Sequence, residues 1–410
     1  MTPSSPRTNP VSILFPILLA LYEMAMYLSN DAYLPALPVI SNELAASHHL
    51  VQLTLTTWFM GSASMQLFLG PVCDRMGRRP VLLLGGIIFV LTSIASAHSQ
   101  SVHALLILRF IQGASIASMA IAGYTSIHEL YQREKAIHTI AIMNSITVLA
   151  PSFGPLFGAV ILTFGDWRLI FSLLGIWAGL CLIGLYLKMP ESMTAGQEKV
   201  RLNTMMKHYR AVISNKAFLL FNLCSQLLFA AMIAWIAAGP FLLVDSFGLK
   251  TLDFGLIQVL IFGSFIISTR LVKLLMRSLT LAGIIRLGIS LSLLGGSTAF
   301  ISAYLWPETL WPMIVAMMCL AGGSGFAFPV LNRLAIDASD APMGARVAMS
   351  SFLMTTSGML ASGLISTVYN GTLISLAMIL FVFSLLAATL QFFNTAPTEH
   401  SVAIRRDNEE

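Results

Sequence analysis

Two carboxylates, Glu23 and Asp31, lie within the first long apolar segment of this 410-residue chain. A charge at the centre of a bilayer costs about 2.5–3.5 kcal/mol on insertion scales, so an acid there is a candidate functional residue. At about 100° per residue, one helix face about 100° wide holds both acids together with Tyr27 and Asn30. The acids are separated by about 12 Å along the helix axis. Because removal from water favours the neutral form of a carboxyl group, we interpret this face as a proton-binding site. The alternative is a pair of structural acids hydrogen-bonded inside a bundle.

Arg109 is a second charge within an apolar segment, the fourth of the chain. Gln112 and Gly113 follow at i+3 and i+4, so they lie on the same face of a helix. A buried guanidinium needs a partner, and its fork of donors suits a carboxylate. We therefore expect Arg109 to pair with Asp31, directly or through Gln112. The alternative is a structural hydrogen-bond hub.

The composition indicates that these charges lie in a membrane. The chain is 57% hydrophobic and 10% charged, whereas soluble domains carry about 25% charged residues. Its apolar runs are about 18–25 residues long, enough to cross about 30 Å of hydrocarbon. We predict an all-α polytopic membrane protein, and the absence of short alternating segments excludes a barrel. The predicted spans are 12–34, 50–70, 81–97, 103–124, 138–163, 168–188, 216–244, 252–271, 279–303, 310–332, 346–367 and 372–393.

The distribution of lysine and arginine predicts the orientation of these twelve spans. With a cytoplasmic N-terminus, every Lys and Arg falls on the cytoplasmic face except Arg109, Arg168, Lys250 and Arg286. Cytoplasmic loops of membrane proteins carry such an excess, so we expect both termini in the cytoplasm. The same excess accounts for the net charge of +5 without any nucleic-acid partner.

The longest polar connection divides the spans into six plus six. We predict an N-terminal bundle over 1–188, a cytoplasmic linker loop over 189–215, a C-terminal bundle over 216–394 and a cytoplasmic tail over 395–410. Such a division suggests two pseudo-symmetric bundles with a site between them near the middle of the membrane.

Two segments carry a specific pattern of glycine, proline and charge. After the second span come Gly70, Asp74, Arg75, Gly77, Arg78 and Arg79. An ordinary basic cytoplasmic loop is the alternative interpretation, but charge bias alone does not require the acid and the two glycines. The fifth span contains Pro151, Gly154, Pro155 and Gly158. Two prolines and two glycines within eight residues suit a bending point, and simple helix packing through small residues is the alternative.

These segments resemble the major facilitator superfamily. The loop after the second span is similar to its signature G-x-x-x-D-R-x-G-R-R. The Arg109–Gly113 stretch resembles the R-x-x-Q-G element of proton-coupled members, and the fifth span resembles the antiporter motif G-P-x-x-G. Residues 30–38 are similar to the first span of the Bcr/CflA drug exporters. The resemblance covers essentially the whole chain and implies the major facilitator fold, with two pseudo-symmetric six-helix bundles.

The resemblance also implies a function, a proton-coupled multidrug exporter (a drug/H+ antiporter) working by alternating access. Asp31 is then the proton site supported by Arg109, and Glu23 recognises cationic substrates with an accessory role in proton binding. The helix faces and the resemblance together suggest six substrate-binding residues: Tyr27, Asn30, Gln112, Met143, Asn144 and Thr147. The resemblance further implies a cytoplasmic latch in the outward-facing state, formed by Asp74, Glu129 and Arg333. Three independently solvated charges are the alternative.

Other functional classes lack support in the sequence. It contains no P-loop, catalytic triad or metal-ligand spacing, so we predict no enzyme, no metal and no cofactor, with protons as the coupling ion. The expected partners are small lipophilic molecules, neutral or cationic, and the lipid bilayer, and the expected form is a monomer in the bacterial inner membrane. Two rival functions stay open: a dedicated exporter of one metabolite, such as a siderophore or sugar, and a non-transporting membrane receptor.

Overall fold

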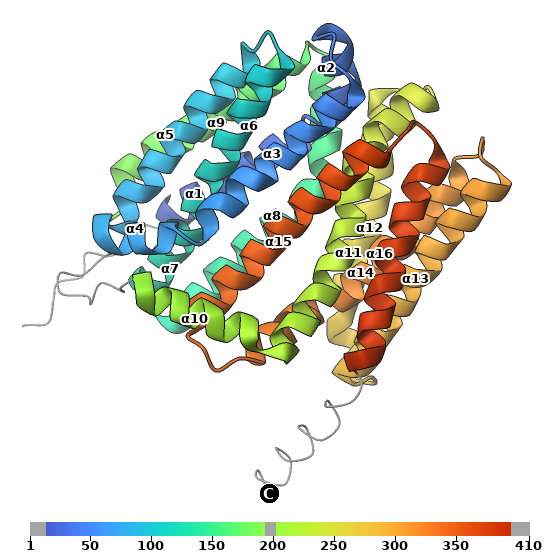
Figure 1. Cartoon of the computed structure of the whole chain (residues 1–410). Helices are drawn as coiled ribbons and strands as arrows, with labels where there is room; N and C mark the ends of the chain where they lie inside the picture. Colours follow the sequence, from blue (N-terminus) through green and yellow to red (C-terminus); the bar gives the residue numbers. More distant parts are fainter. Residues whose placement is uncertain (1–13, 193–201, 395–410) are drawn as a thin grey trace, which may run out of the picture.

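The chain folds into long helices that run roughly side by side (Figure 1). The computed structural model describes residues 14–192 and 202–394, and the side chains of a few residues in α8 also lie outside the described part. Within these ranges the regular structure is helical and includes no strand. The α-helices are α1 (Leu14–Asp31), α2 (Leu37–Glu43), α3 (His48–Gln66), α4 (Leu69–Met76), α5 (Arg78–Ala97), α6 (Val102–Ser118), α7 (Tyr124–Leu130), α8 (Arg133–Leu162), α9 (Trp167–Lys188), α10 (Leu202–Ser214), α11 (Lys216–Pro240), α12 (Thr251–Leu275), α13 (Leu281–Leu305), α14 (Trp311–Asp337), α15 (Met343–Val368) and α16 (Leu373–Asn394).

Three short segments interrupt or extend these helices. A 3₁₀ turn, η1 (Leu34–Ala36), follows α1, and π-helical turns η2 (Met119–Gly123) and η3 (Phe241–Ser246) extend α6 and α11. Proline at the second position of η1 explains the tight turn there, because proline presets the backbone angle at the start of a helix. π-helical turns often occur at functional sites, and both lie close to contacts described below.

The helices match the predicted spans. Nine described segments are long and apolar enough to cross a membrane: α5, α6 with its extension to Leu130, α9, α11 with η3, and α12 to α16. The other three predicted spans coincide with α1, α3 and α8. The prediction of an all-α membrane protein is therefore confirmed.

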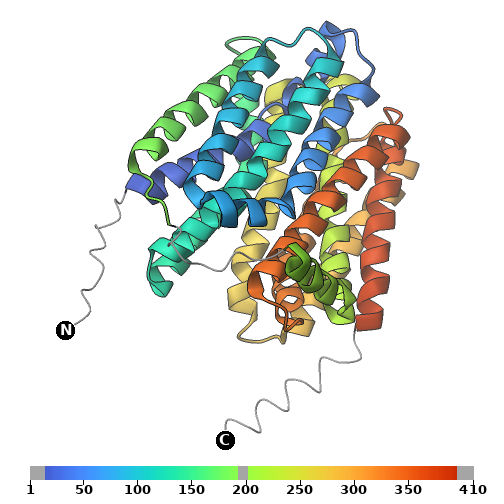
Figure 2. The ribbon, with the colours of Figure 1, turned by 60° about the vertical axis from the view of Figure 1, so that its left-hand side comes forward.

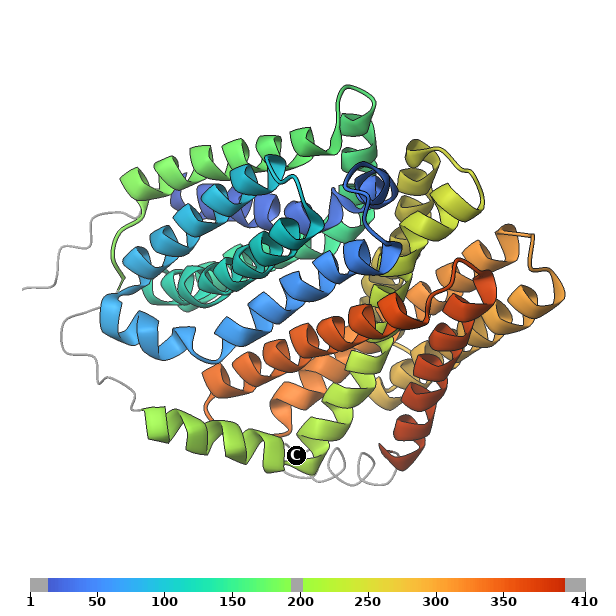
Figure 3. The same ribbon diagram turned by 45° about the horizontal axis from the view of Figure 1, so that its top comes forward.

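The helices up to α9 pack mainly with one another, and those from α11 onward do the same. In the first group, α3 packs on α6, α5 on α6 and α9, and α1 on α8 and α9. In the second group, α13 packs on α14 and α16, and α11 on α14, α15 and α16. Figures 2 and 3 show the groups on opposite sides of the molecule, blue to green on one side and yellow to red on the other.

Two helix pairs form the main contacts between the groups, α3 with α15 and α8 with α12. The second pair approaches closely because Gly255 carries no side chain. A Cβ at this glycine would lie 2.7 Å from the Cα of Leu156. We call the end of the molecule where α2 lies the α2 end, and the opposite end, where α4 and α10 lie, the α10 end (Figure 1).

Hydrogen bonds between the groups lie toward the α2 end of α3. The Gln52 amide donates to the carbonyl oxygen of Ala237 at 3.2 Å, and the Thr56 hydroxyl donates to the Ser362 hydroxyl at 3.0 Å. Closer to the start of the same helix, Nδ1 of His49 lies 2.8 Å from the carbonyl oxygen of Ser366. In this conformation, polar contacts therefore hold the two groups together on the α2 side.

Two predicted loops contain helices, since most of the loop after the second span forms α4 and the linker loop contains α10. Residues 202–214 belong to the expected linker loop, yet they form α10, which lies across the α10 end (Figure 1). Tyr209 and Val212 are buried against the second group. Their spacing of three residues puts both side chains on one helix face, so packing of this face stabilises a helix in a segment that is otherwise polar.

Candidate functional site

The acid-bearing face of α1 is buried, as the helical wheel predicts. Glu23 is 1% exposed, Asn30 6% and Asp31 5%, while Tyr27 is partly buried against the core. A buried charge needs compensating partners, so the neighbours of these side chains decide what the site can do.

Arg109 joins α6 to this face through a chain of hydrogen bonds. Its guanidinium is fully buried. Nη2 donates to Asn30 Oδ1 at 3.0 Å, while Nη1 donates to Gln112 Oε1 at 2.5 Å and to the Ser29 carbonyl oxygen at 3.1 Å. The Asn30 amide nitrogen in turn donates to Asp31 Oδ1 at 3.4 Å. The guanidinium thus reaches the carboxylate through Asn30, neither directly nor through Gln112.

In this structure two of the expected substrate-binding residues, Gln112 and Asn30, make hydrogen bonds within the protein. Both ends of the Gln112 amide bond to protein groups. Its oxygen accepts a hydrogen bond from Arg109, and its nitrogen donates to the Ser93 hydroxyl on α5 at 2.8 Å. Asn30 lies between a cation and an acid. Both side chains therefore position Arg109 in this structure, and their contact with a substrate stays a prediction.

Aromatic rings surround the same guanidinium. Its central carbon lies 4.3 Å from the centroid of the Tyr33 ring and 5.9 Å from those of Trp58 and Phe171. Such rings attract a cation most strongly where water is excluded. The Tyr33 hydroxyl bonds to Thr54 at 3.0 Å, which fixes the closest ring. These three rings therefore stabilise the charged guanidinium within an apolar interior, where a charge is otherwise unfavourable.

The residues of the antiporter-like motif press α8 against the end of α1. A Cβ at Gly154 would lie 2.6 Å from the Cβ of Asp31, and one at Gly158 would lie 1.6 Å from the carbonyl oxygen of Ala32. Pro151 and Pro155 occupy interior positions of the same helix. The glycines are thus required by close approach, and they place α8 directly on Asp31.

Glu23 has a separate set of neighbours. Its Oε1 accepts a hydrogen bond from the Tyr124 hydroxyl at 2.6 Å. Tyr124 begins α7, directly after the π-helical turn η2. A regular helical wheel does not bring Tyr124 to Glu23, because the π-helical turn changes the register of the side chains that follow it. The two acids therefore have different partners, Tyr124 for Glu23 and Asn30 for Asp31.

The remaining expected substrate residues are only partly described. Met143 is buried in the core shared by both groups. Asn144 and Thr147 lie in α8, but their side chains are outside the described part of the chain.

The signature loop forms an ion cluster within the first group. Arg78 donates to Asp74 at 2.7 Å and to Glu129 at 3.0 Å. Gly77 takes a φ of +96°, a conformation that favours glycine, and it precedes α5. Among the described residues, Arg333 pairs instead with Asp337, one turn further along α14. The cluster thus combines Asp74 and Glu129 as expected, with Arg78 between them rather than Arg333.

The rest of this loop contacts other segments near the α10 end. Glu191 accepts hydrogen bonds from the backbone NH of Arg78 at 3.0 Å and of Arg79 at 3.2 Å. A Cβ at Gly70 would lie 3.4 Å from the Met205 side chain of α10, and Arg75 is exposed. The loop is therefore fixed by the segment that follows α9.

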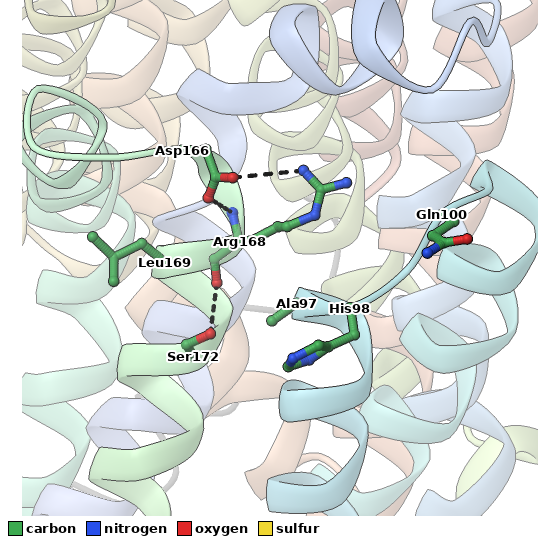
Figure 4. A pocket seen from close by; sticks show the side chains of 7 residues that line it. All are labelled: Ala97, His98, Gln100, Asp166, Arg168, Leu169 and Ser172. Carbon is green, nitrogen blue, oxygen red and sulfur yellow. Dashed lines mark hydrogen bonds and ion pairs between the residues drawn. The ribbon is translucent and has the colours of Figure 1, made fainter.

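A surface pocket of about 430 Å³ lies at the α2 end, and none of these residues lines it (Figure 4). Its lining comes from the end of α5 and the start of α9: Ala97, His98, Gln100, Asp166, Arg168, Leu169 and Ser172. Arg168 pairs with Asp166 at 3.6 Å and also with Glu43.

This end of α2 is fixed by hydrogen bonds to α9. The Trp167 indole donates to Glu43 at 2.6 Å. Hydrogen bonds from Arg168 and Trp167 hold the pKa of the Glu43 carboxyl below its usual value. The bonds therefore favour the carboxylate form of Glu43, and the stability that they add to the fold is lost as the pH falls. Arg168 lines the pocket and already pairs with two carboxylates, Glu43 and Asp166. We therefore assign the residues at this pocket the role of anchoring α2 to α9.

Comparison with known proteins agrees with this architecture. The family model described as Major Facilitator Superfamily matches residues 19–366. The chain is 31% identical over 345 residues to the multidrug resistance protein MdtM of Salmonella typhimurium strain LT2, with 84% of each chain covered. It is 32% identical over 361 residues to the multidrug transporter MdfA of Yersinia pestis bv. Antiqua (strain Angola), covering 86% of this chain and 87% of the relative.

Solved structures with low sequence identity show the same fold. A bacterial homologue of the human lysosomal transporter Spinster, in an inward-facing conformation, superposes with a TM-score of 0.74 at 14% identity, over 94% of this chain and 97% of the other. A D-xylose–proton symporter gives a TM-score of 0.71 at 14% identity, over 92% and 97%. These two similarities concern the fold alone.

Proposed function

Because the chain belongs to the major facilitator superfamily of transporters, we propose that it is a proton-coupled exporter of small lipophilic molecules, neutral or cationic. Its similarity to two multidrug transporters supports export of such compounds. The observation that carries the proton coupling is the buried chain from Arg109 through Asn30 to Asp31. A guanidinium linked by one amide to a buried carboxylate responds to the protonation of that carboxylate.

In this proposal Asp31 is the coupling group. While Asp31 is charged, Asn30 bridges it to Arg109, and the two opposite charges stabilise each other. Protonation removes the negative charge and leaves the guanidinium with neutral partners, which favours a different arrangement around it. Because α8 touches Asp31 through Gly154 and packs on α12 of the other group, a change at Asp31 reaches the contact between the groups through two helix pairs.

Glu23 serves substrate recognition in this proposal. Its carboxylate is buried and accepts a hydrogen bond from Tyr124, and a buried carboxylate attracts a substrate of opposite charge. Tyr27 lies one turn away on α1. In this proposal α8 contributes Met143, Asn144 and Thr147 to the substrate-binding site. Met143 offers a flexible apolar surface. Protonation of Glu23 weakens its attraction for a cation, which gives it an accessory part in coupling.

Alternating access follows from competition between proton and substrate. The two six-helix bundles, 1–188 and 216–394, move as units about the linker. The excess of basic residues supports an orientation with the α10 end in the cytoplasm of a bacterial inner membrane. The hydrogen bonds near the α2 end then close the outer side, as in an inward-facing state. In the outward-facing state we propose that Arg333 joins Asp74 and Glu129 in the latch. The working unit is a monomer, with protons as its coupling ion.

Substrate affinity is expected to fall as the pH is lowered, and Asp31→Asn or Glu23→Gln should weaken this dependence. Protons and substrate compete for the same carboxylates, so removing one titrating group removes part of the competition. The measurement is the Kd of a fluorescent lipophilic cation for the detergent-solubilised protein, at about pH 6 and about pH 8, with a change of about tenfold or more in the wild type if one proton is displaced.

Asp340→Asn is the matched control, since it makes the same chemical change at an exposed position between α14 and α15. It should keep the full pH dependence. Wild-type binding that is indifferent to pH would defeat the coupling scheme.

A further inference from the structure

Helix α3 begins with two consecutive histidines, and both contact the other group of helices. His48 Nε2 lies 3.4 Å from Oδ2 of Asp245 in η3. The centroid of the His48 ring is 4.4 Å from that of Phe241 in the same turn. His49 Nδ1 lies 2.8 Å from the carbonyl oxygen of Ser366 in α15. The start of α3 thus bridges to two different elements at the α2 end.

The His48 contact is open to solution. The His48 side chain is 50% exposed and that of Asp245 is 31% exposed. Protons from the aqueous phase on this side therefore reach the pair without entering the bundle. The pair of His48 and Asp245 thus differs from Asp31 and Arg109, which are buried.

The contact between His48 and Asp245 is an ion pair only when the His48 ring is protonated. A carboxylate forms an ion pair with an imidazolium but only a weaker hydrogen bond with a neutral ring. The Phe241 ring face likewise attracts a cation. Histidine is the side chain whose charge ordinarily changes between about pH 5 and pH 8. His49 differs, since a carbonyl oxygen accepts a hydrogen bond from Nδ1–H in either charge state.

Other titratable groups lie on the elements packed around this contact. Glu43, at the end of α2, is paired with Arg168. His103 is exposed at the start of α6, and Lys250 is exposed just before α12. Tyr369 follows α15 and is nearly neutral across the range in which histidine titrates. Asp245 is therefore the acid that pairs with His48 in this structure.

We propose that His48 and Asp245 form a proton-responsive latch that closes the outer side of the transporter. This proposal rests on the proposed orientation, in which the α2 end faces the periplasm. Acid in the periplasm charges His48, ties α3 to η3 and stabilises the closed outer side. The same acid loads the central carboxyl in the outward-facing state. Proton loading and outer closure are thus favoured together, which speeds the return to the inward-facing state.

The test is the distance distribution between the outer ends of the two groups. Gln100→Cys and Glu308→Cys place spin labels on exposed loops of the first and second group, in a chain whose four native cysteines are replaced. Double electron–electron resonance in lipid nanodiscs then gives the ratio of closed to open molecules. The variants are His48→Gln, Asp245→Asn and the combination, measured at about pH 5.5 and about pH 8, with His49→Gln as the matched control.

At the lower pH, His48→Gln and Asp245→Asn should each reduce the closed-to-open ratio by about twofold to fivefold, the range of exposed ion pairs. The combination should reduce it no further than either alone. At the higher pH, each variant should match the wild type, and His49→Gln should show no pH-dependent loss. Equal ratios in wild type and His48→Gln at the lower pH would overturn the proposal, as would additive effects in the combination.

This measurement needs neither substrate nor a proton gradient. If the protein showed the His48-dependent closure but did not exchange substrate for protons, the latch would stand and the proposed transport function would fail. A protein that exports substrate with protons but shows no His48-dependent closure would give the opposite result. The two proposals therefore fail separately.

Discussion

Replacing Arg109 by alanine is expected to abolish proton-coupled transport while the protein still reaches the membrane. The substitution removes the donors for Asn30, Gln112 and the Ser29 carbonyl, and each buried acceptor left unpaired costs about 1–3 kcal/mol. It also removes the positive charge that Asn30 links to Asp31. Transport should fall to the level of cells without the protein, measured as substrate efflux with intracellular pH recorded in parallel.

Two further substitutions separate charge, geometry and folding. Arg109→Lys keeps a charge but loses the planar fork that reaches three acceptors, so it should stay strongly impaired. Arg286→Ala removes an exposed arginine from α13 and should transport normally. Membrane amount and thermal stability are measured for all three. Loss of folded Arg109→Ala protein would favour the structural-hub alternative, and full activity of this variant would contradict both interpretations.

Gly158→Ala is expected to have the second largest effect. The new methyl group would lie 1.6 Å from the carbonyl oxygen of Ala32, and backbone atoms cannot yield as a flexible side chain does. The two helices must separate next to Asp31, and overpacking of this kind costs about 1–3 kcal/mol, occasionally more. We expect both a lower melting temperature and transport reduced by about tenfold or more, read from purified protein and from efflux in cells.

Gly263→Ala is the control, because a Cβ at this helical glycine in α12 would have no atom within 4 Å beyond its chain neighbours and the backbone of its own helix. It should be neutral or slightly stabilising, since alanine is the better helix former. If Gly158→Ala behaved like Gly263→Ala, the close contact between α1 and α8 would have no importance for transport.

The fold could be predicted from the sequence because hydrophobic length decides it. Each of the twelve apolar runs becomes a helix, since a backbone within the hydrocarbon must satisfy its own hydrogen bonds. Helices also form outside these runs, at α4 in the predicted loop after the second span and at α10, whose amphipathic face lies in a polar segment too short to span the membrane. The α10 helix depends on packing against the second group, which no local pattern reveals.

The site could be predicted only as far as helix faces. The wheel places Glu23, Asn30 and Asp31 on one face of α1, and all three are buried. It does not tell which side chain reaches Arg109, because that depends on the crossing of α1 and α6 and on side-chain rotamers. Asn30 rather than Gln112 joins the two charges for this reason. A regular helical wheel does not bring Tyr124 to Glu23, because a π-helical turn precedes it.

The expected cytoplasmic latch shows a further limit, since charge positions in a transporter depend on the conformation. Asp74 and Glu129 share Arg78, whereas Arg333 pairs within its own helix. The sequence contains all four charges but carries no information on which state is populated. In the conformation described, polar contacts join the groups near the α2 end, so the latch with Arg333 stays a prediction for the opposite state.

The most direct test of proton-coupled export uses purified protein in liposomes with an imposed pH gradient. Substrate should move against its own gradient toward the acidic side, with protons moving in the opposite direction, and Asp31→Asn should stop both fluxes. Movement of substrate that ignores the pH gradient, or equal proton-driven movement by Asp31→Asn, would contradict the assignment of Asp31 as the coupling group.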